Sequence, residues 1–133
     1  MGQTIPDNCI SVEEARELQD TWNKTRGKEL KTRLGFEDTR EFWWSVEELE
    51  EYLNYVKKES LKQGIQNPGI RVYFGAYSKE KCQEKKGFST LFLSPTESPS
   101  GSFTTASSSS SLKNNYKLKA FNRGGTGNPP HRY

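Results

Sequence analysis

Few side chains in this chain have the types and spacing that catalysis needs. The single histidine, His131, stands close to the carboxyl end, directly after two prolines. A Ser-His-Asp or Cys-His arrangement would depend on this one residue. Two distant cysteines, Cys9 and Cys82, do not make a tetrahedral zinc set with one histidine. We therefore expect no catalytic residue, no metal and no cofactor, and an enzyme only if His131 or Cys82 lies in a folded cleft.

A glycine-rich run from Gly124 to Gly127 has the composition of a phosphate-binding loop. It lacks the Lys-Ser/Thr pair of a P-loop, and no helical pattern follows it to supply an anion-binding helix start. We interpret the run as a flexible turn, with docking against the rest of the domain as the alternative.

Basic and aromatic residues that share strand faces are the best candidates for a binding surface. Alternation places Arg71, Tyr73 and Tyr77 on one face of a strand over 70–77. It places Lys117 and Lys119 on one face of a strand over 116–121. Tyr and Arg concentrate binding energy at protein interfaces, and an aromatic, basic sheet face also suits single-stranded nucleic acid. The alternative is that the first helix covers and buries the tyrosines. The predicted binding residues are Arg71, Tyr73, Tyr77, Lys117 and Lys119.

Two helices are predicted from matching start signals. Ser11 and Ser45 each precede a Val-Glu-Glu run. This spacing predicts a capping box, in which the serine oxygen accepts a bond from the amide three residues on and the glutamate there returns one. Apolar residues at three- and four-residue spacing predict one helix over 12–24, which Gly27 ends or weakens, and one more short helical turn at Leu30 and Leu34 before Gly35. The same spacing predicts a second helix from residue 46 to a stop at Gly64, with an apolar stripe of Val46, Leu49, Tyr52, Leu53 and Val56.

Four short strands are predicted around the second helix, over 40–44, 70–77, 89–93 and 116–121, with Pro95 closing the third. Trp43 and Trp44 must point to opposite faces of the first strand, so one of them is a surface anchor unless both sheet faces are covered. The chain is therefore expected to have an α+β fold, with two capped helices packed on a small, mainly antiparallel sheet of three to four strands.

Residues 1–133 are expected to form one domain, with its core at about 10–93 and 112–123. Twelve of the eighteen residues over 94–111 are Ser or Thr. Because this composition buries too little apolar surface to offset the entropy of ordering, we predict a flexible loop there. The Gly/Pro-rich residues 124–133 are predicted to be a tail.

The composition excludes some classes of protein. No stretch approaches the roughly 18 consecutive apolar residues of a membrane span, and the amino terminus lacks the pattern of a secretion signal. We expect a cytoplasmic protein with free thiols and no membrane partner. Residues 1–69 carry 10 basic and 14 acidic groups, whereas residues 70–133 carry 10 basic and 3 acidic groups. This asymmetry is typical of a partner surface, or of charges that only solvate the two halves.

Two segments carry a resemblance, Arg40-Glu-Phe-Trp-Trp-Ser-Val-Glu-Glu-Leu-Glu-Glu-Tyr-Leu53 and Gly69-Ile-Arg-Val-Tyr-Phe-Gly-Ala-Tyr77. Together with a strand-like segment over 90–96 and a Gly/Pro-Pro ending over 124–130, they resemble a group of small bacterial proteins of unknown function. The similarity covers about residues 10–96 and the tail. It implies no activity, cofactor or site residue.

The function expected from these observations is a non-catalytic binding module for protein partners. The first alternative is a nucleic-acid binder that uses the basic carboxyl-terminal half, which would show a strongly salt-dependent affinity for oligonucleotides. The second alternative is a small enzyme with an unrecognised site.

Overall fold

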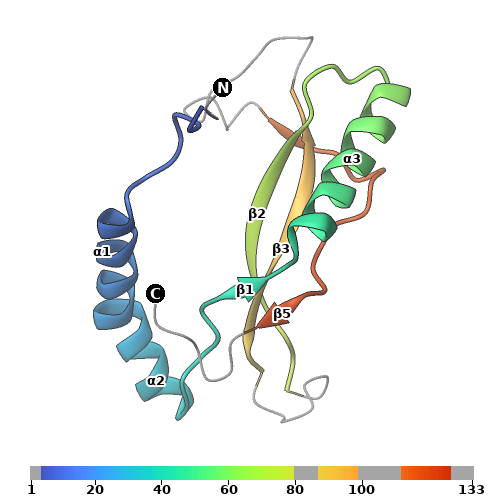
Figure 1. The fold of residues 1–133 in the computed structure, drawn as a ribbon. Coiled ribbons are helices and arrows are strands. Elements are labelled where there is room, and N and C mark those ends of the chain that lie inside the picture. Colours follow the sequence, from blue (N-terminus) through green and yellow to red (C-terminus); the bar gives the residue numbers. More distant parts are fainter. Residues whose placement is uncertain (1–3, 80–86, 99–111, 127–133) are drawn as a thin grey trace.

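The computed structural model describes residues 4–79, 87–98 and 112–126. They form an α+β fold with a three-stranded antiparallel sheet in the order β2-β3-β4 and a separate two-stranded pair of β1 and β5 (Figure 1). In chain order the elements are α1 (Val12–Trp22), the π-helix η1 (Asn23–Gly27), α2 (Lys28–Leu34), β1 (Phe42–Trp43), α3 (Val46–Lys62), β2 (Gly69–Ala76), β3 (Ser89–Glu97), β4 (Lys113–Asn114) and β5 (Gly125–Thr126). Within these residues no helix is long and apolar enough to cross a membrane.

Helix α3 packs on the sheet and makes the core. It begins at Ser45 with both bonds of the predicted capping box, and the chain turns away at Gly64, which has a positive φ of 76°. The buried apolar cluster consists of Tyr52, Val56, Leu93 and Leu118, with Trp44, Leu49, Tyr55, Ile70 and Phe121 packed around it. α3 therefore contributes a narrower face than predicted, since Val46 and Leu53 of the expected stripe are exposed.

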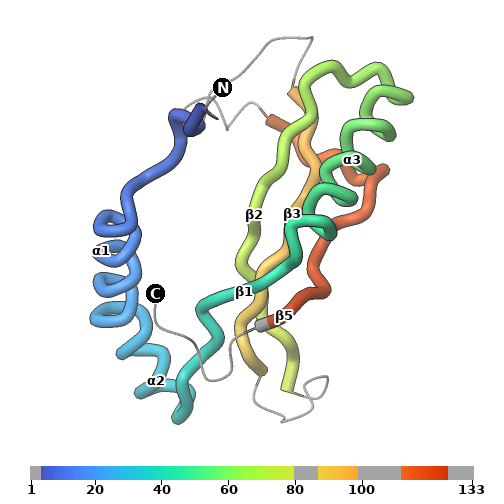
Figure 2. Tube along the Cα trace, viewed as in Figure 1, coloured from blue at the N-terminus to red at the C-terminus, as the bar shows by residue number. Residues whose placement is uncertain are grey.

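The amino-terminal helix is longer than predicted and stands apart from the sheet. Ser11 caps it by accepting a bond from the Glu14 amide at 3.1 Å, which is one of the two bonds of the predicted capping box, whereas Ser45 forms both. Instead of ending near Lys24 or being broken at Gly27, the helix continues through η1 into α2. α2 confirms the short turn predicted before Gly35, which is left-handed with φ of 83°. None of its residues is buried, and Figure 2 shows it outside the sheet, with a change of direction between α1 and α2.

Strand β3 passes through Pro95, which was predicted to close it. Both main-chain groups of Leu93 bond to Phe121, so the nitrogen of Pro95, two residues on, points to the same side and away from β2. The missing N–H therefore removes no bond between β2 and β3, and Pro95 lies opposite Ile70 in a continuous ladder. Residues 94–97 thus belong to the sheet and not to the predicted flexible loop, and 99–111 lie outside the described residues.

The predicted strand over 116–121 is wrong. The pairing segment is β4, which lies just before it, and in the predicted range only Phe121 forms a bridge, with Leu93. Asn115 is the reason: its buried side chain accepts a bond from the Lys117 amide and donates one to Gln63 of the α3 carboxyl end. This turn breaks the alternation and directs Leu118 into the core.

The glycine-rich run docks against the domain, which confirms the alternative interpretation for its described part. β5 pairs with β1, which is shorter than the strand predicted over 40–44, and a Cβ at Gly124 would lie 2.5 Å from the Trp43 carbonyl oxygen. Trp44 packs inward and donates to the Asn122 carbonyl at 3.2 Å, whereas Trp43 is 64% exposed. The two tryptophans therefore do point to opposite sides, one toward the core and one toward solvent. Residues 127–133 of the predicted tail lie outside the described residues.

Candidate functional site

Strand β2 is an edge strand with one unpaired side. The main-chain groups of Arg71, Tyr73 and Tyr77 point toward β3. The Tyr77 amide, for example, donates to the Phe88 carbonyl at 3.1 Å and so continues the ladder just past the end of β2. Main-chain groups alternate in direction along a strand, so those of Ile70, Val72 and Phe74 point away from β3. Within the described residues no strand pairs with this side of β2. The edge therefore presents a row of free donors and acceptors.

Exposed apolar side chains accompany this edge. Val72 and Phe74 are 58% and 85% exposed, although they share a sheet face with the core residue Leu93. α3 covers the Ile70 end of that face and leaves the Phe74 end open. The alternation of apolar and polar residues was predicted correctly, but the other elements cover only part of the apolar face of β2.

A groove separates the amino-terminal helix from β2. Its cavity of about 540 Å³ is lined by Leu18, Trp22 and Leu30 from the helix, and by Phe42 and Phe74 from the other side. We call it the α1–β2 groove. Its charged lining residues are Arg26 and Arg40. Two apolar surfaces, one on the helix and one on the sheet, thus face each other across an unfilled space.

The opposite face of β2 carries the predicted tyrosines in a polar network. Asn114 donates to the Tyr73 hydroxyl at 2.8 Å and accepts from the Arg71 guanidinium at 2.8 Å. Tyr73 also stacks on Phe92, with ring centroids 5.2 Å apart. The bonds from Asn114 and then Arg71 lower the pKa of Tyr73, because they stabilise the phenolate. Tyr77 donates to the Asn122 side chain at 3.0 Å.

The amino-terminal helix does not cover these tyrosines. Phe74 lines the groove with Leu18, so the helix lies on the side opposite to Tyr73. Tyr77 is 44% exposed and Tyr73 is half-buried, so neither ring is enclosed. The expectation that Tyr73 and Tyr77 are accessible beside Arg71 agrees with this arrangement.

The two predicted lysines do not extend this surface. Lys117 and Lys119 are exposed, but they stand on the irregular segment around Leu118. The Lys119 amide donates to the Tyr55 hydroxyl, and its carbonyl accepts from Tyr52, so this segment is bound to α3. The structure therefore brings Arg71, Tyr73 and Tyr77 together, and places Lys117 and Lys119 on a different element.

Sequence reasoning missed the residues that hold the surface in place. Asn114 and Asn122 bind the two tyrosines, and Asn122 also donates to the Leu91 carbonyl at 2.7 Å. Both asparagines lie more than 30 residues from the tyrosines that they bind on β2 and beside it, so no local pattern connects them. The sequence contained only a weak indication that Phe74 is exposed. The apolar face of β2 has the same character at Ile70, Val72 and Phe74, and one helix cannot cover the whole of that face.

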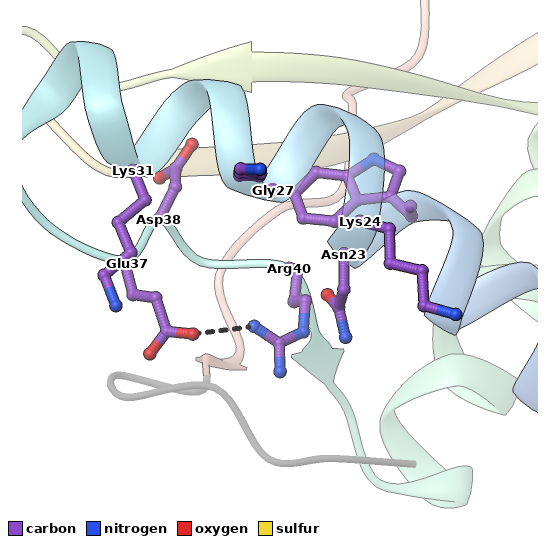
Figure 3. A pocket seen from close by; sticks show the side chains of 9 residues that line it. Asn23, Lys24, Gly27, Lys31, Glu37, Asp38 and Arg40 are labelled. Atoms are coloured by element: carbon purple, nitrogen blue, oxygen red, sulfur yellow. Dashed lines mark ion pairs between the residues drawn. The ribbon is translucent and has the colours of Figure 1, made fainter.

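A second cavity of about 570 Å³ lies under the π-helix (Figure 3). Asp38 lines it and is buried, and it accepts bonds from the Ser89 amide at 2.7 Å, the Ser89 hydroxyl and the Thr39 amide at 2.9 Å. Glu37 pairs with Arg40 at 3.5 Å. These contacts attach the linker before β1 to the start of β3.

The described part of the chain was expected to hold a site only if His131 or Cys82 lay in a folded cleft. It contains no group of three or more His, Cys, Asp or Glu side chains that could hold a metal ion. Cys9 is exposed and free, whereas Cys82 and His131 lie outside the described residues. No family model, curated protein or solved structure matches this chain.

Proposed function

We propose that this chain is a non-catalytic protein-interaction module that binds an extended segment of a partner protein along β2. The observation that carries the proposal is the free edge of β2, with its outward main-chain groups at Val72 and Phe74 and their exposed side chains. An added strand satisfies such groups with main-chain hydrogen bonds, and side-chain pockets then give specificity.

The two sides of β2 would receive alternate residues of the bound segment. Residues on one side would enter the α1–β2 groove against Phe74, Leu18 and Trp22. Residues on the other side would lie beside Tyr73 and Tyr77, which are side chains of the type that supplies much of the binding energy at protein interfaces. The predicted binding residues on β2 are thus one border of the same site.

Nucleic acid is the less favoured partner. Binding to phosphates needs cations that are free to replace counterions. The Arg71 guanidinium is already bound to Asn114 and to the Leu112 carbonyl, and Lys117 and Lys119 stand on another element. The aromatic, basic platform required by that hypothesis therefore lacks two of its predicted cations.

The proposal is tested with a displayed library of random linear peptides, using Phe74→Pro and Phe74→Ala as a matched pair. The Phe74 amide points away from β3, so proline removes a free donor without removing a ladder bond. Alanine removes the same ring but keeps the amide. We expect selected peptides to alternate apolar and polar residues, to bind Phe74→Ala weakly, and to lose binding to Phe74→Pro altogether.

Three results would overturn it. One is a library that yields no alternating peptide, and another is selected peptides that bind Phe74→Pro as well as the parent chain. The third is a salt-dependent affinity for oligonucleotides that Lys117→Gln and Lys119→Gln abolish, which would favour the nucleic-acid alternative.

A further inference from the structure

Helix α3 has a row of exposed residues beside its core face. The row begins at the first residue of the helix and continues in steps of three or four residues, which keeps it on one side of α3. All its members are exposed, and they are Val46, Glu50, Leu53, Lys57 and Leu61. We call this row the α3 ridge.

The apolar side chains of the α3 ridge are not used in the core. Val46 and Leu61 are 72% and 74% exposed, Leu53 is 41% exposed, and none of the three belongs to the buried cluster. Beside the ridge, a cavity of about 550 Å³ separates α3 from the start of β2, and its lining includes Leu53, Leu61, Ile65 and Ile70. Figure 1 shows α1 and α2 on the other side of β2, so they do not cover this surface. A contiguous exposed apolar surface of this kind is typical of an interaction site.

The charges of the α3 ridge are also without partners in the fold. Glu50 and Lys57 lie about two helical turns apart. Within the part of the chain that the structure describes, neither side chain forms an ion pair. Glu50 lies between two apolar positions of the ridge, and so does Lys57. The order along the ridge is therefore apolar, acidic, apolar, basic, apolar.

This order is complementary to itself when one helix is reversed. Glu50 lies three residues before Leu53, and Lys57 lies four residues after it. An antiparallel second copy of α3, related by a two-fold axis beside Leu53, therefore places its Lys57 against Glu50. Val46 lies seven residues before Leu53 and Leu61 eight residues after it, so these two apolar side chains also meet across the axis. A two-fold axis repeats each of these contacts, whereas a parallel copy would place Glu50 against Glu50.

We propose that two copies of this chain associate through antiparallel packing of their α3 ridges, with Leu53 of both copies at the two-fold axis. Steps of three and four residues are the spacing at which paired helices interlock their side chains. An interface built from one pair of helices is small, so we expect a reversible dimer that dissociates on dilution.

This inference goes beyond the proposed function, because it concerns a different surface and a different partner. No residue of the α3 ridge lines the α1–β2 groove, and the free edge of β2 is not part of the ridge. Peptide binding is judged by Phe74→Pro and the dimer by changes in the ridge, so either proposal can fail without the other.

The test is sedimentation equilibrium of the full chain at low salt, with charge reversals in the ridge. We expect the parent chain to dimerise. Glu50→Lys and Lys57→Glu each create two like-charged pairs across the axis, so each should raise the dissociation constant by roughly tenfold. An equimolar mixture of the two variants should restore association, because every pair between them has opposite charges. The double variant should associate like the parent chain for the same reason.

The matched controls are Glu51→Lys and Lys58→Glu. Both positions are exposed, and they lie on α3 with the same spacing of seven residues, but one position further around the helix and off the ridge. These variants should dimerise like the parent chain. Circular dichroism and urea midpoints of all the variants should match those of the parent, since every substituted side chain is exposed.

Several outcomes would overturn the dimer. One is a parent chain that stays monomeric up to roughly 1 mM, the weak end of specific association. Others are single reversals that associate as tightly as the parent, a mixture that stays monomeric, and controls that weaken association as much as the ridge reversals. A dimer that Phe74→Pro abolishes and the ridge reversals leave intact would place the contact at the edge of β2 instead.

Discussion

Tyr52 has a buried ring and a hydrogen-bonded hydroxyl group in the core. Its ring stacks on Phe121 with centroids 4.6 Å apart, and its hydroxyl donates to the Lys119 carbonyl at 2.9 Å. Burial, followed by the neighbouring Tyr55, raises the pKa of Tyr52 to about 12 from 10.0. The phenol is therefore stabilised in its neutral form inside the core.

The first prediction concerns alkaline stability. The raised pKa of Tyr52 contributes stability that is complete below pH 10 and is lost as the pH rises from 10 to 12. The loss in the free energy of unfolding should reach at most about 2–3 kcal/mol. Urea melts of Tyr52→Phe should show a smaller fall over this range, and about 1 kcal/mol lower stability at neutral pH. Tyr116→Phe, at an 87% exposed position, is the control and should change neutral stability little. An equally steep fall in Tyr52→Phe would contradict the assignment.

The second prediction compares two adjacent glycines. A Cβ at Gly124 would lie 2.5 Å from the Trp43 carbonyl oxygen, whereas a Cβ at Gly125 would meet the Trp43 ring at an ordinary 3.5 Å. Gly124→Ala should therefore lower the free energy of unfolding by about 2 kcal/mol or more, through forced backbone movement. Gly125→Ala should change it by less than about 0.5 kcal/mol. Thermal melts of both variants decide the matter, and equal midpoints would mean that the run does not dock on Trp43.

At the scale of elements, the two helices begin with the same Ser-Val-Glu-Glu sequence but differ in how much of each helix is buried. Ser45 forms both bonds of its capping box and begins a helix that buries Tyr52, Val56 and Ser60. Ser11 begins a helix with no buried residue. Most helical stability in proteins comes from packing an apolar face, so only α3 is coupled to the core.

The third prediction follows from this difference. Ser45→Ala should lower the free energy of unfolding by about 1 kcal/mol, because the Glu48 amide loses its acceptor. Ser11→Ala should leave the urea midpoint unchanged and reduce only the helical circular dichroism signal. A shared shift of the urea midpoint in both variants would show that α1 unfolds together with the sheet.

At the scale of the whole molecule, local features were predicted and long-range ones were not. The caps at Ser11 and Ser45 and the stop at Gly64 depend on residues within one turn, so the sequence carries them directly. The prediction that Pro95 ends the third strand was wrong, because whether a strand can contain proline at this position depends on a distant residue. Phe121 bonds both main-chain groups of Leu93, and so fixes the side of β3 on which Pro95 lacks an N–H.

The same limit applies to the candidate site. Alternation and residue type placed Arg71, Tyr73 and Tyr77 on one strand face, but they left open whether the first helix covers the two tyrosines. The free edge of β2 did not, since it depends on the position of β2 in the strand order. The separation of Lys117 and Lys119 from Arg71 depends on the turn at Asn115, which buries Leu118 and ends the alternation.

The fourth prediction is that the molecule has two levels of stability. α3, β2 and β3 contain or contact the buried cluster, whereas α1, η1 and α2 bury no residue. Those amide hydrogens of the first group that are bonded within α3 or between strands should exchange only through global unfolding, and those of the second group many times faster, through local opening. The outward amides of β2, such as that of Phe74, are unpaired and are left out of the comparison. Native-state hydrogen exchange measures both. Uniform protection across α1 and α3 would contradict the division.

The pairing of β1 with β5 also affects when the chain can finish folding during synthesis. Trp44 bonds to Asn122, which lies 78 residues later, and β1 finds its strand partner only at Gly125. At a translation rate of about 5–20 residues per second, Trp44 waits roughly 4 to 16 seconds before Asn122 has been made. During that time the Trp44 side of the core and the free edge of β2 are exposed together. The nascent chain therefore passes through a period in which a chaperone, or a neighbouring nascent chain on the same messenger, can occupy the Trp44 surface that the finished protein later closes.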